Sequence, residues 1–345
     1  MLLLATIPAP PSKPSFLDRA GLRGPRMKYW FLYVAAFYVV WLLLVSVFGY
    51  WPHVKSHWPI SVVMIFGSLV AGSTPMGGGT VAFPVLVLVF GQPPDIGRNF
   101  GLMIQALGMT SAMLFILCRG TKIQKGMLIW TGVGSAAGLV VGTFGVAPVV
   151  ASTTVKLLFS CLWMSFAVLT LAKNREICSL DQNPAIGDTK AMHLGMAVGF
   201  AGGVTTSLIG VGVEMMLYTV LVLLFRCDLK IAVPSAVSAM AVASVLGIAL
   251  HLAIGDVDAE VFYNWLAAGP IVVFGAPAGA LLVSIIPRIR TLYFVSLLCV
   301  VQFVWTLYQV KPKPGEWMFV ACSLLIAVGG FYLLYRLGRR AASPR

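Results

Sequence analysis

The stretch STPMGGGT, residues 73–80, interrupts an apolar segment of about thirty residues, 60–90, and the stretch TTSLIGVG, residues 205–212, interrupts residues 192–225 in the same way. Each segment is too long for one straight span. Each arm holds about twelve residues, or about 18 Å at 1.5 Å per residue, whereas the hydrocarbon core of a bilayer is about 30 Å thick. We therefore expect that neither arm crosses a membrane alone, and that both segments form broken helices at membrane depth.

The composition is that of an integral membrane protein. Of the 345 residues, 59% are hydrophobic and 10% are charged, and the mean hydropathy is +0.93. Soluble domains carry about a quarter charged residues. The net charge of +13 comes from Lys and Arg in the short connections between apolar runs, as the positive-inside rule predicts, so we expect no nucleic-acid partner. The six cysteines show no CxxC or metal-ligand spacing, which indicates free thiols.

Apolar runs long enough to span a membrane predict an all-α polytopic protein with about eight transmembrane helices plus two re-entrant broken-helix hairpins. The runs are residues 29–49, 96–117, 127–146, 155–172, 231–254, 261–285, 291–310 and 316–335. If each broken segment crossed once, two basic loops would fall outside the cell. If each returns to its own side, nearly all basic loops and both termini are cytoplasmic, and the acidic loop 256–260 lies outside. Lys311 and Lys313 are the exceptions, and we favour the hairpins.

The two halves resemble each other. Residues 95–136 align with 230–271 without gaps, matching Gly120 with Gly255 and Trp130 with Trp265. A hairpin plus three spans is an odd number of crossings, so two tandem copies have opposite orientations. The predicted organisation is a basic, disordered tail (1–28), a first span and loop (29–59), repeat 1 (60–172), a cytoplasmic linker (173–191), repeat 2 (192–310), and a last span with a basic tail (311–345). The N-terminus does not resemble a signal peptide, and Met27 is an alternative start to Met1.

Irregular backbone survives at membrane depth only where protein or a water-filled cavity surrounds it, and many secondary transporters place their substrate sites at such breaks. Glycines allow positive φ, and the start of the following half-helix offers free N–H groups to an anion. The competing interpretation is that these glycines only pack helices closely. The expected substrate-binding positions are Ser73, Thr74, Gly77, Gly78, Gly79, Thr80, Asn99, Gln105, Thr205, Thr206, Ser207, Gly210, Gly212, Ser235 and Ser238.

Charged residues at membrane depth are few. Glu214 is a candidate for proton coupling, because a carboxylate inside a membrane usually has a function. The alternative is that a Glu in the first turn of a half-helix stabilises the start of that helix. Arg98 lies at a span mouth, where it would draw anions inward or anchor the helix at the interface. We interpret His251 as a satisfied interfacial histidine.

The chain resembles the TauE/SafE family of membrane permeases, also called sulfite exporters, over residues 61–307. The resemblance rests on GSLVAGSTPMGGGTVAFPVLVLVFG and DIGRNFGLMIQALGMTSAM, and on a second copy, GFAGGVTTSLIGVGVEMMLYTVL and KIAVPSAVSAMAVASVLGIALHLAIGDVD. The second motif departs from the family pattern, with Thr219 near the expected proline. The resemblance implies transport of sulfite, organosulfonates or related anions across a bacterial inner membrane.

The leading hypothesis is therefore a secondary anion permease, coupled to protons, in the inner membrane. A passive anion channel and a non-transporting membrane partner subunit are the alternatives. We expect no enzyme, because there are four histidines and no HExxH or GxSxG motif, and we expect no metal and no cofactor. The expected partners are a small anion and the bilayer, and assembly into a homo-oligomer stays open.

Overall fold

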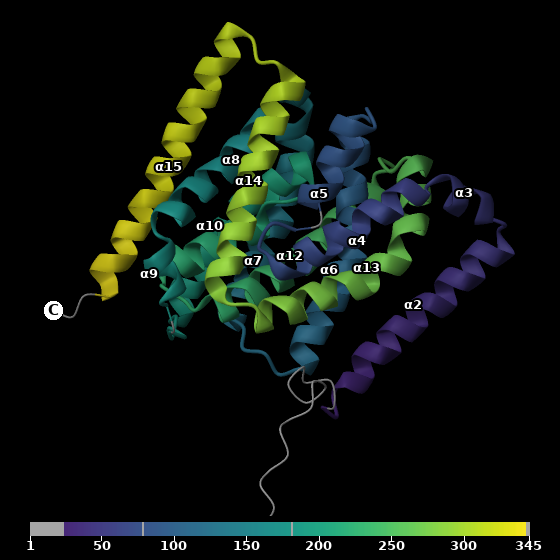
Figure 1. Ribbon diagram of the computed structural model, residues 1–345, viewed down its shortest axis with the longest axis horizontal. Helices are drawn as coiled ribbons and strands as arrows, with labels where there is room; N and C mark the ends of the chain where they lie inside the picture. The colour runs from purple at the N-terminus through teal and green to yellow at the C-terminus, as the bar shows by residue number, and fades with distance from the viewer. Residues whose placement is uncertain (1–23, 78, 181, 343–345) are drawn as a thin grey trace, which may run out of the picture.

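The computed structural model describes residues 24–77, 79–180 and 182–342 (Figure 1), and these residues form helices joined by short connections. The prediction of an all-α polytopic membrane protein is confirmed. Within the described residues, nine helices are long and apolar enough to cross a membrane. The helices are α2 (Met27–Val47), α3 (Trp51–Ser56), α4 (Trp58–Ser73), α5 (Gly79–Pro84), α6 (Pro94–Cys118), α7 (Lys125–Val141), α8 (Ser152–Ala172), α9 (Asn174–Cys178), α10 (Asp188–Ile209), α11 (Val213–Thr219), α12 (Leu229–Ala253), α13 (Ala259–Ile285), α14 (Arg288–Val310) and α15 (Pro314–Ala342). Of the predicted tail 1–28, residues 1–23 lie outside the described part.

Three π-helical turns and one 3-10 turn complete the backbone: η1 (Val85–Val89), η2 (Gly142–Val146), η3 (Ala147–Val149) and η4 (Val220–Leu224). α6 and α12 pass through the middle of the bundle, and α2 and α15 lie at its two edges (Figure 1). We name the two ends of the bundle by acidic residues. The Asp256 end carries Gly91 and Asp256, and the Asp228 end carries Gly120 and Asp228.

The first hairpin, α4 to η1, enters and leaves at the Asp256 end. His57 and Pro59 before its first arm line one surface pocket together with Phe90 and Gln92 after its second arm. The second hairpin, α10 to η4, does the same at the Asp228 end, where the N–H of Asp228 donates to the carbonyl of Gln182 at 2.8 Å. The hairpins therefore enter the bundle from opposite ends.

The first arm of each hairpin is longer than its sequence predicted. α4 has 16 residues and α10 has 22 residues. At 1.5 Å per residue, α10 is about 33 Å long and could cross alone, so the expectation that neither arm crosses alone was wrong for α10. Its hydroxyls bond to carbonyls one turn back, Thr205 to Ala201 at 3.0 Å and Ser207 to Val204 at 2.7 Å, and these bonds satisfy both polar side chains inside the helix. α10 ends only at Gly210, where φ is 78°.

Each long arm packs tightly against a helix of the other half of the chain. α10 lies on α7, where a Cβ at Gly138 would overlap the carbonyl oxygen of Phe200. α4 lies on α13, where a Cβ at Gly72 would overlap the carbonyl oxygen of Ala276. Glycine allows this close backbone approach in both places, and this packing positions the hairpin tips.

The short arms end alike. In η1 the N–H of Phe90 donates to Val85 at 2.9 Å, and in η4 the N–H of Phe225 donates to Val220 at 3.1 Å. The helices that follow, α6 and α12, both have 25 residues. Two tandem copies of opposite orientation would produce this correspondence. The inverted repeat and its boundaries stay a prediction.

Candidate functional site

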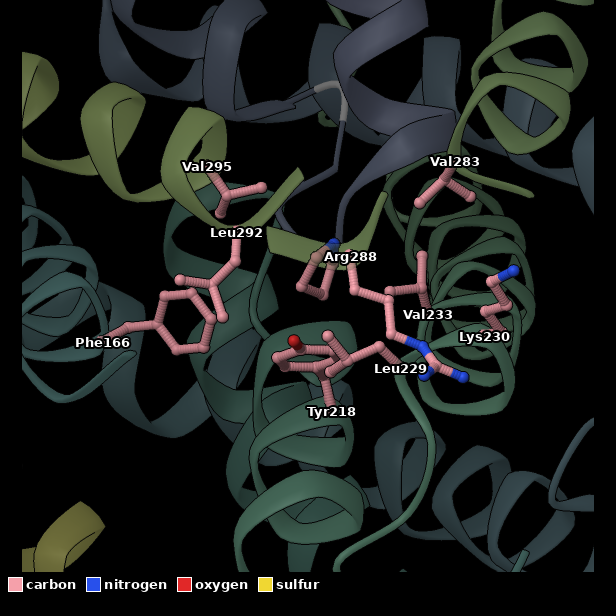
Figure 2. Close-up of a pocket in the computed structure, with 10 residues that line it drawn as sticks. Phe166, Tyr218, Leu229, Lys230, Val233, Val283, Arg288, Leu292 and Val295 are labelled. Atoms are coloured by element: carbon pink, nitrogen blue, oxygen red, sulfur yellow. The ribbon is translucent and has the colours of Figure 1, made fainter. Parts of the chain in front are cut away.

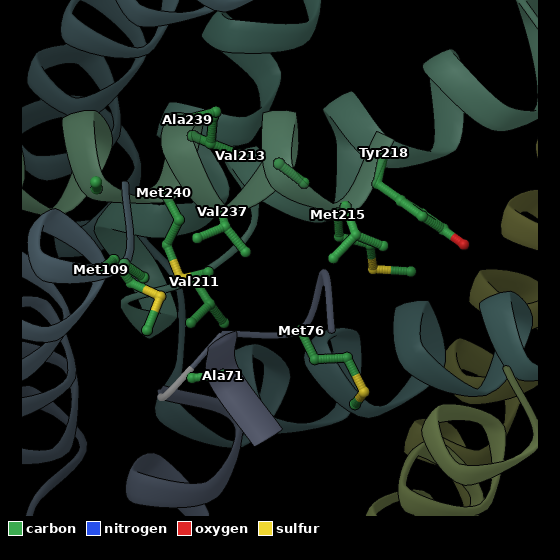
Figure 3. Packing of buried hydrophobic residues seen from close by; sticks show 14 of the residues in the cluster. Ala71, Met76, Met109, Val211, Val213, Met215, Tyr218, Val237, Ala239 and Met240 are labelled. Carbon is green, nitrogen blue, oxygen red and sulfur yellow. The ribbon is translucent and has the colours of Figure 1, made fainter. Parts of the chain in front are cut away.

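The tips of the two hairpins contact each other inside the bundle. Gly77, with φ of 77°, lies against two residues: a Cβ added to it would be 2.7 Å from the sulfur of Met240 and 3.2 Å from Oε1 of Glu214. Figure 3 shows the chain at Met76 of the first tip between Val211 and Met215 of the second, with the Met76 side chain turned away from both; its sulfur lies 3.7 Å from that of Cys299. The structure therefore brings the first glycine of STPMGGGT together with the buried carboxylate of the second hairpin.

At the first tip, the hydroxyls are bonded within the hairpin. Thr74 donates to the carbonyl of Val70 at 2.8 Å and accepts from the N–H of Met76 at 3.3 Å. Ser73 donates to the same carbonyl at 3.2 Å. Gly78 lies outside the described residues, and α5 begins with Gly79 and Thr80.

The second tip holds a carboxyl group of its own chain. Glu214 is 1% exposed, and its Oε1 accepts from the N–H of Gly212 at 3.2 Å. The next N–H, of Val213, points at the hydroxyl of Thr206 at 3.4 Å. The half-helix start therefore binds a carboxylate of this chain in the position that the sequence predicted for a substrate.

Gln105 is the predicted polar residue that reaches the second tip. Its Nε2 lies 3.4 Å from the carbonyl oxygen of Gly210, and its Oε1 accepts from Ser244 at 3.1 Å. Ser244 was not among the predicted residues. It lies one helical turn after Met240, which contacts Gly77, and that spacing of four on α12 is the signal that could have identified it.

Ser235 and Ser238 form no hydrogen bond to the described residues of the first tip. Ser235 donates to Ile231 at 2.7 Å and accepts from the N–H of Gln124 at 2.9 Å, so it ties α12 to the start of α7. Ser238 donates to Pro234 at 2.8 Å. Both hydroxyls are engaged in helix packing.

A polar cluster covers the second tip at the Asp256 end. Arg98 donates to Oδ2 of Asp256 at 2.7 Å, and Nδ1 of His251 lies 2.9 Å from the same oxygen. Asn99 accepts from Arg98 at 3.0 Å and donates to the carbonyl of Asp256. A Cβ at Gly210 would lie 2.9 Å from the carbonyl oxygen of Arg98. We call Arg98, Asn99, His251 and Asp256 the Arg98 cluster.

The Arg98 cluster changes two expectations. Arg98 does not lie free at a span mouth, because it is 9% exposed and its charge is paired with Asp256. His251 is fully buried and only half satisfied: Nδ1 is bonded, while Nε2 has no partner among the described residues. Asp256, which the sequence placed in an outer loop, is the residue that joins them.

A pocket borders the first tip toward the Asp228 end, which we call the Pro75 pocket (Figure 2). The cavity is small, with a volume of about 30 Å³. The pocket is lined by two basic residues, Lys230, which is exposed, and Arg288, which is partly exposed. Its remaining walls are Pro75, Phe166, Tyr218, Leu229, Val233, Val283, Leu292 and Val295. The surroundings of the two tips thus differ: a small pocket borders the first tip, whereas the Arg98 cluster lies over the second.

Among the described residues, no group of three His, Cys, Asp or Glu side chains could hold a metal ion. A family model described as "Sulfite exporter TauE/SafE" matches residues 60–306, which is most of the chain. The match contains both hairpins and leaves out α2 and α15. No curated protein and no solved structure gives a match.

Proposed function

Because the chain belongs to the TauE/SafE sulfite exporter family, whose members are membrane transporters of sulfur-containing anions, we propose that it is a secondary permease for sulfite, an organosulfonate or a related sulfur anion. In this proposal it lies in a bacterial inner membrane with both termini in the cytoplasm. The Asp228 end then faces the cytoplasm and the Asp256 end faces outward, in line with the charges of their loops.

The contact between Gly77 and Glu214 carries the proposal. Two broken helices that enter from opposite ends and touch in the interior are how many secondary transporters build a substrate site. Backbone N–H groups at the tips are neutral donors, so they would bind an anion and also release it. A fixed Lys or Arg would hold a dehydrated anion more strongly.

The difference between the two ends supports alternating access. The Pro75 pocket borders the first tip on the side of the Asp228 end, while the Arg98 cluster lies between the second tip and the Asp256 end. In our proposal this asymmetry corresponds to an inward-facing carrier. The opposite state would require the Arg98–Asp256 ion pair to open and the Pro75 pocket to close.

Glu214 suggests how a proton would be coupled to transport. Its carboxylate accepts from the N–H of Gly212 and lies next to Gly77. A substrate anion that binds to the backbone N–H groups of the tips would therefore be repelled by the negative charge of Glu214. Protonation of Glu214 would remove that charge and weaken its hold on Gly212. An anion and a proton would then bind together, which is symport.

Flux measurements on the full chain in liposomes would test the proposal. We expect uptake of labelled sulfite that is accelerated by sulfite inside the vesicle and driven by a proton gradient. Acceleration by internal substrate is a property of carriers, so uptake without it would indicate a channel. No flux of sulfite, thiosulfate or any sulfonate would reject transport and favour a non-transporting partner subunit.

A further inference from the structure

We propose that a basic pocket at the Asp228 end, beside the start of α2, binds the phosphate headgroup of an anionic phospholipid. The pocket lies where α6 turns at Gly120 toward α7, and Arg26, Lys122 and Lys125 line it. We call it the Lys122 pocket. Its volume of about 590 Å³ is in the range of ligand sites. α2, which supplies Arg26, lies outside the residues that the family model matches, so the pocket is an addition to the part of the chain that holds both hairpins.

The charge of the Lys122 pocket comes from three exposed side chains. Arg26 lies directly before α2, Lys122 lies in the connection between α6 and α7, and Lys125 is the first residue of α7. None of the three pairs with a carboxylate in the described part of the chain. Among the described residues, no Asp or Glu lines the pocket. Basic residues at the end of a membrane helix attract anionic headgroups, and three of them converge here.

Apolar side chains beside the same pocket favour a lipid over a soluble phosphate. Leu117, at the end of α6, is exposed, and Ile123 is partly buried, and both line the pocket. α2 runs along the edge of the bundle (Figure 1), and its exposed side chains include Tyr29 and Leu32. In a bilayer such a surface contacts acyl chains. A phospholipid can therefore place its phosphate among the three basic side chains while its acyl chains lie against α2.

The backbone that carries the three basic residues is held in place by the bundle. The N–H of Gln124 donates to the hydroxyl of Ser235 on α12 at 2.9 Å, and Nε2 of Gln124 donates to Oδ1 of Asn183 at 2.7 Å. α2 is fixed on α6 by Trp30, whose Nε1 donates to Ser111 at 3.0 Å. The pocket therefore exists before a lipid binds, and little conformational entropy of the backbone is lost on binding.

Lipid binding to the purified full chain tests the site. Native mass spectrometry in a neutral detergent would follow titration with phosphatidylglycerol and with phosphatidylcholine of the same acyl chains. Phosphatidylglycerol should bind about tenfold more tightly. The double variant Lys122→Gln/Lys125→Gln should weaken its binding about thirtyfold, which corresponds to about 2 kcal/mol for two basic residues. The matched control, Lys190→Gln/Arg290→Gln, removes two exposed charges at the same end but outside the pocket, and should bind phosphatidylglycerol like the unchanged protein.

Arg26→Gln is a second variant, for the case that the double variant does not fold, and it should weaken binding about fivefold.

Glycerol 3-phosphate distinguishes a lipid from a soluble phosphate. It carries the phosphate group without acyl chains, so a tenfold excess over phosphatidylglycerol, by about one order of magnitude, should leave the lipid bound. Displacement of the lipid would make the pocket a site for soluble phosphates and would overturn the inference. Equal binding of the two phospholipids, or an equal loss of binding in the two double variants, would overturn it as well. None of these measurements involves flux, so their outcome is independent of whether sulfite is transported.

Discussion

Glu214 lies directly against Gly77, so that a single methyl group on residue 77 would come within 3.2 Å of the carboxylate oxygen Oε1. The two residues belong to hairpins that enter the bundle from opposite ends. Their contact joins the two halves of the chain, and the first two predictions concern it.

Gly77→Ala should abolish sulfite flux and destabilise the protein. The new Cβ would meet Met240 at 2.7 Å, and φ of 77° costs a non-glycine residue about 1 to 2 kcal/mol. Gly91→Ala is the matched control, because it has φ of 68° and open space around it. Thermal unfolding of Gly91→Ala should show only the loss of stability that comes from the backbone conformation, and the variant should retain its sulfite flux. Equal behaviour of the two variants would mean that the tip contact has no role.

Glu214→Gln should separate exchange from accumulation. The amide oxygen still accepts from Gly212, but the group no longer titrates, so sulfite exchange should persist while accumulation driven by a proton gradient is lost. Glu316→Gln is the control, because Glu316 also accepts from a backbone N–H, that of Lys313 at 2.7 Å, at an exposed helix start. Unchanged accumulation by Glu214→Gln between pH 5 and 8 would leave Glu214 as a helix-terminus residue.

Asp256→Asn should loosen the Arg98 cluster. The variant keeps an acceptor but loses the charge that pairs with Arg98. The free energy of unfolding should fall by about 1 to 2 kcal/mol, and not by more, because Asp256 is partly exposed to water. A cysteine at Val211, now 1% exposed, should react several-fold faster with an impermeant thiol reagent from the Asp256 end.

Asp258→Asn is the control in the same loop. Asp258 caps α13 by accepting from Glu260 at 2.7 Å, and Asn caps a helix equally well. Its effect on stability and on labelling should be small. If labelling of Val211→Cys does not change in Asp256→Asn, the Arg98 cluster is not the outer closure.

Gly138→Ala should prevent α10 from packing on α7. The added methyl group would overlap the carbonyl oxygen of Phe200, and overpacking of this kind costs about 1 to 3 kcal/mol. Gly126→Ala, on the same helix, places its Cβ 3.4 Å from that of Ala191 and should be tolerated. Thermal unfolding of the two purified variants compares them, and equal stability would contradict the close packing.

Labelling of single cysteines in whole cells should determine which end faces outward. After removal of the native cysteines, an impermeant reagent should reach cysteines at Ser56 and Gly91 from outside, and those at Lys190 and Lys230 only after the cells are opened. The fold places each pair at one end of the bundle. The reverse pattern would invert the proposed orientation, and mixed labelling within a pair would contradict the hairpin.

The class of protein and the places where its helices break were predictable from the sequence. A run of about twenty apolar residues is a membrane span because of its own transfer free energy, whatever surrounds it. α4 ended at Ser73, within the first predicted break, and α10 ended at Gly210, within the second; Gly210 has φ of 78°, a conformation that glycine adopts readily.

The lengths of the arms and the partners of the polar residues were decided by the tertiary structure. α10 continued through Thr205 and Ser207, where α7 offered a close surface and the two hydroxyls found acceptors in the preceding turn. Arg98 became buried because Asp256, far along the chain, supplied its counter-charge. A buried polar group must find a partner, and any helix of the bundle can supply it, so no local pattern could identify Glu214 as the neighbour of Gly77.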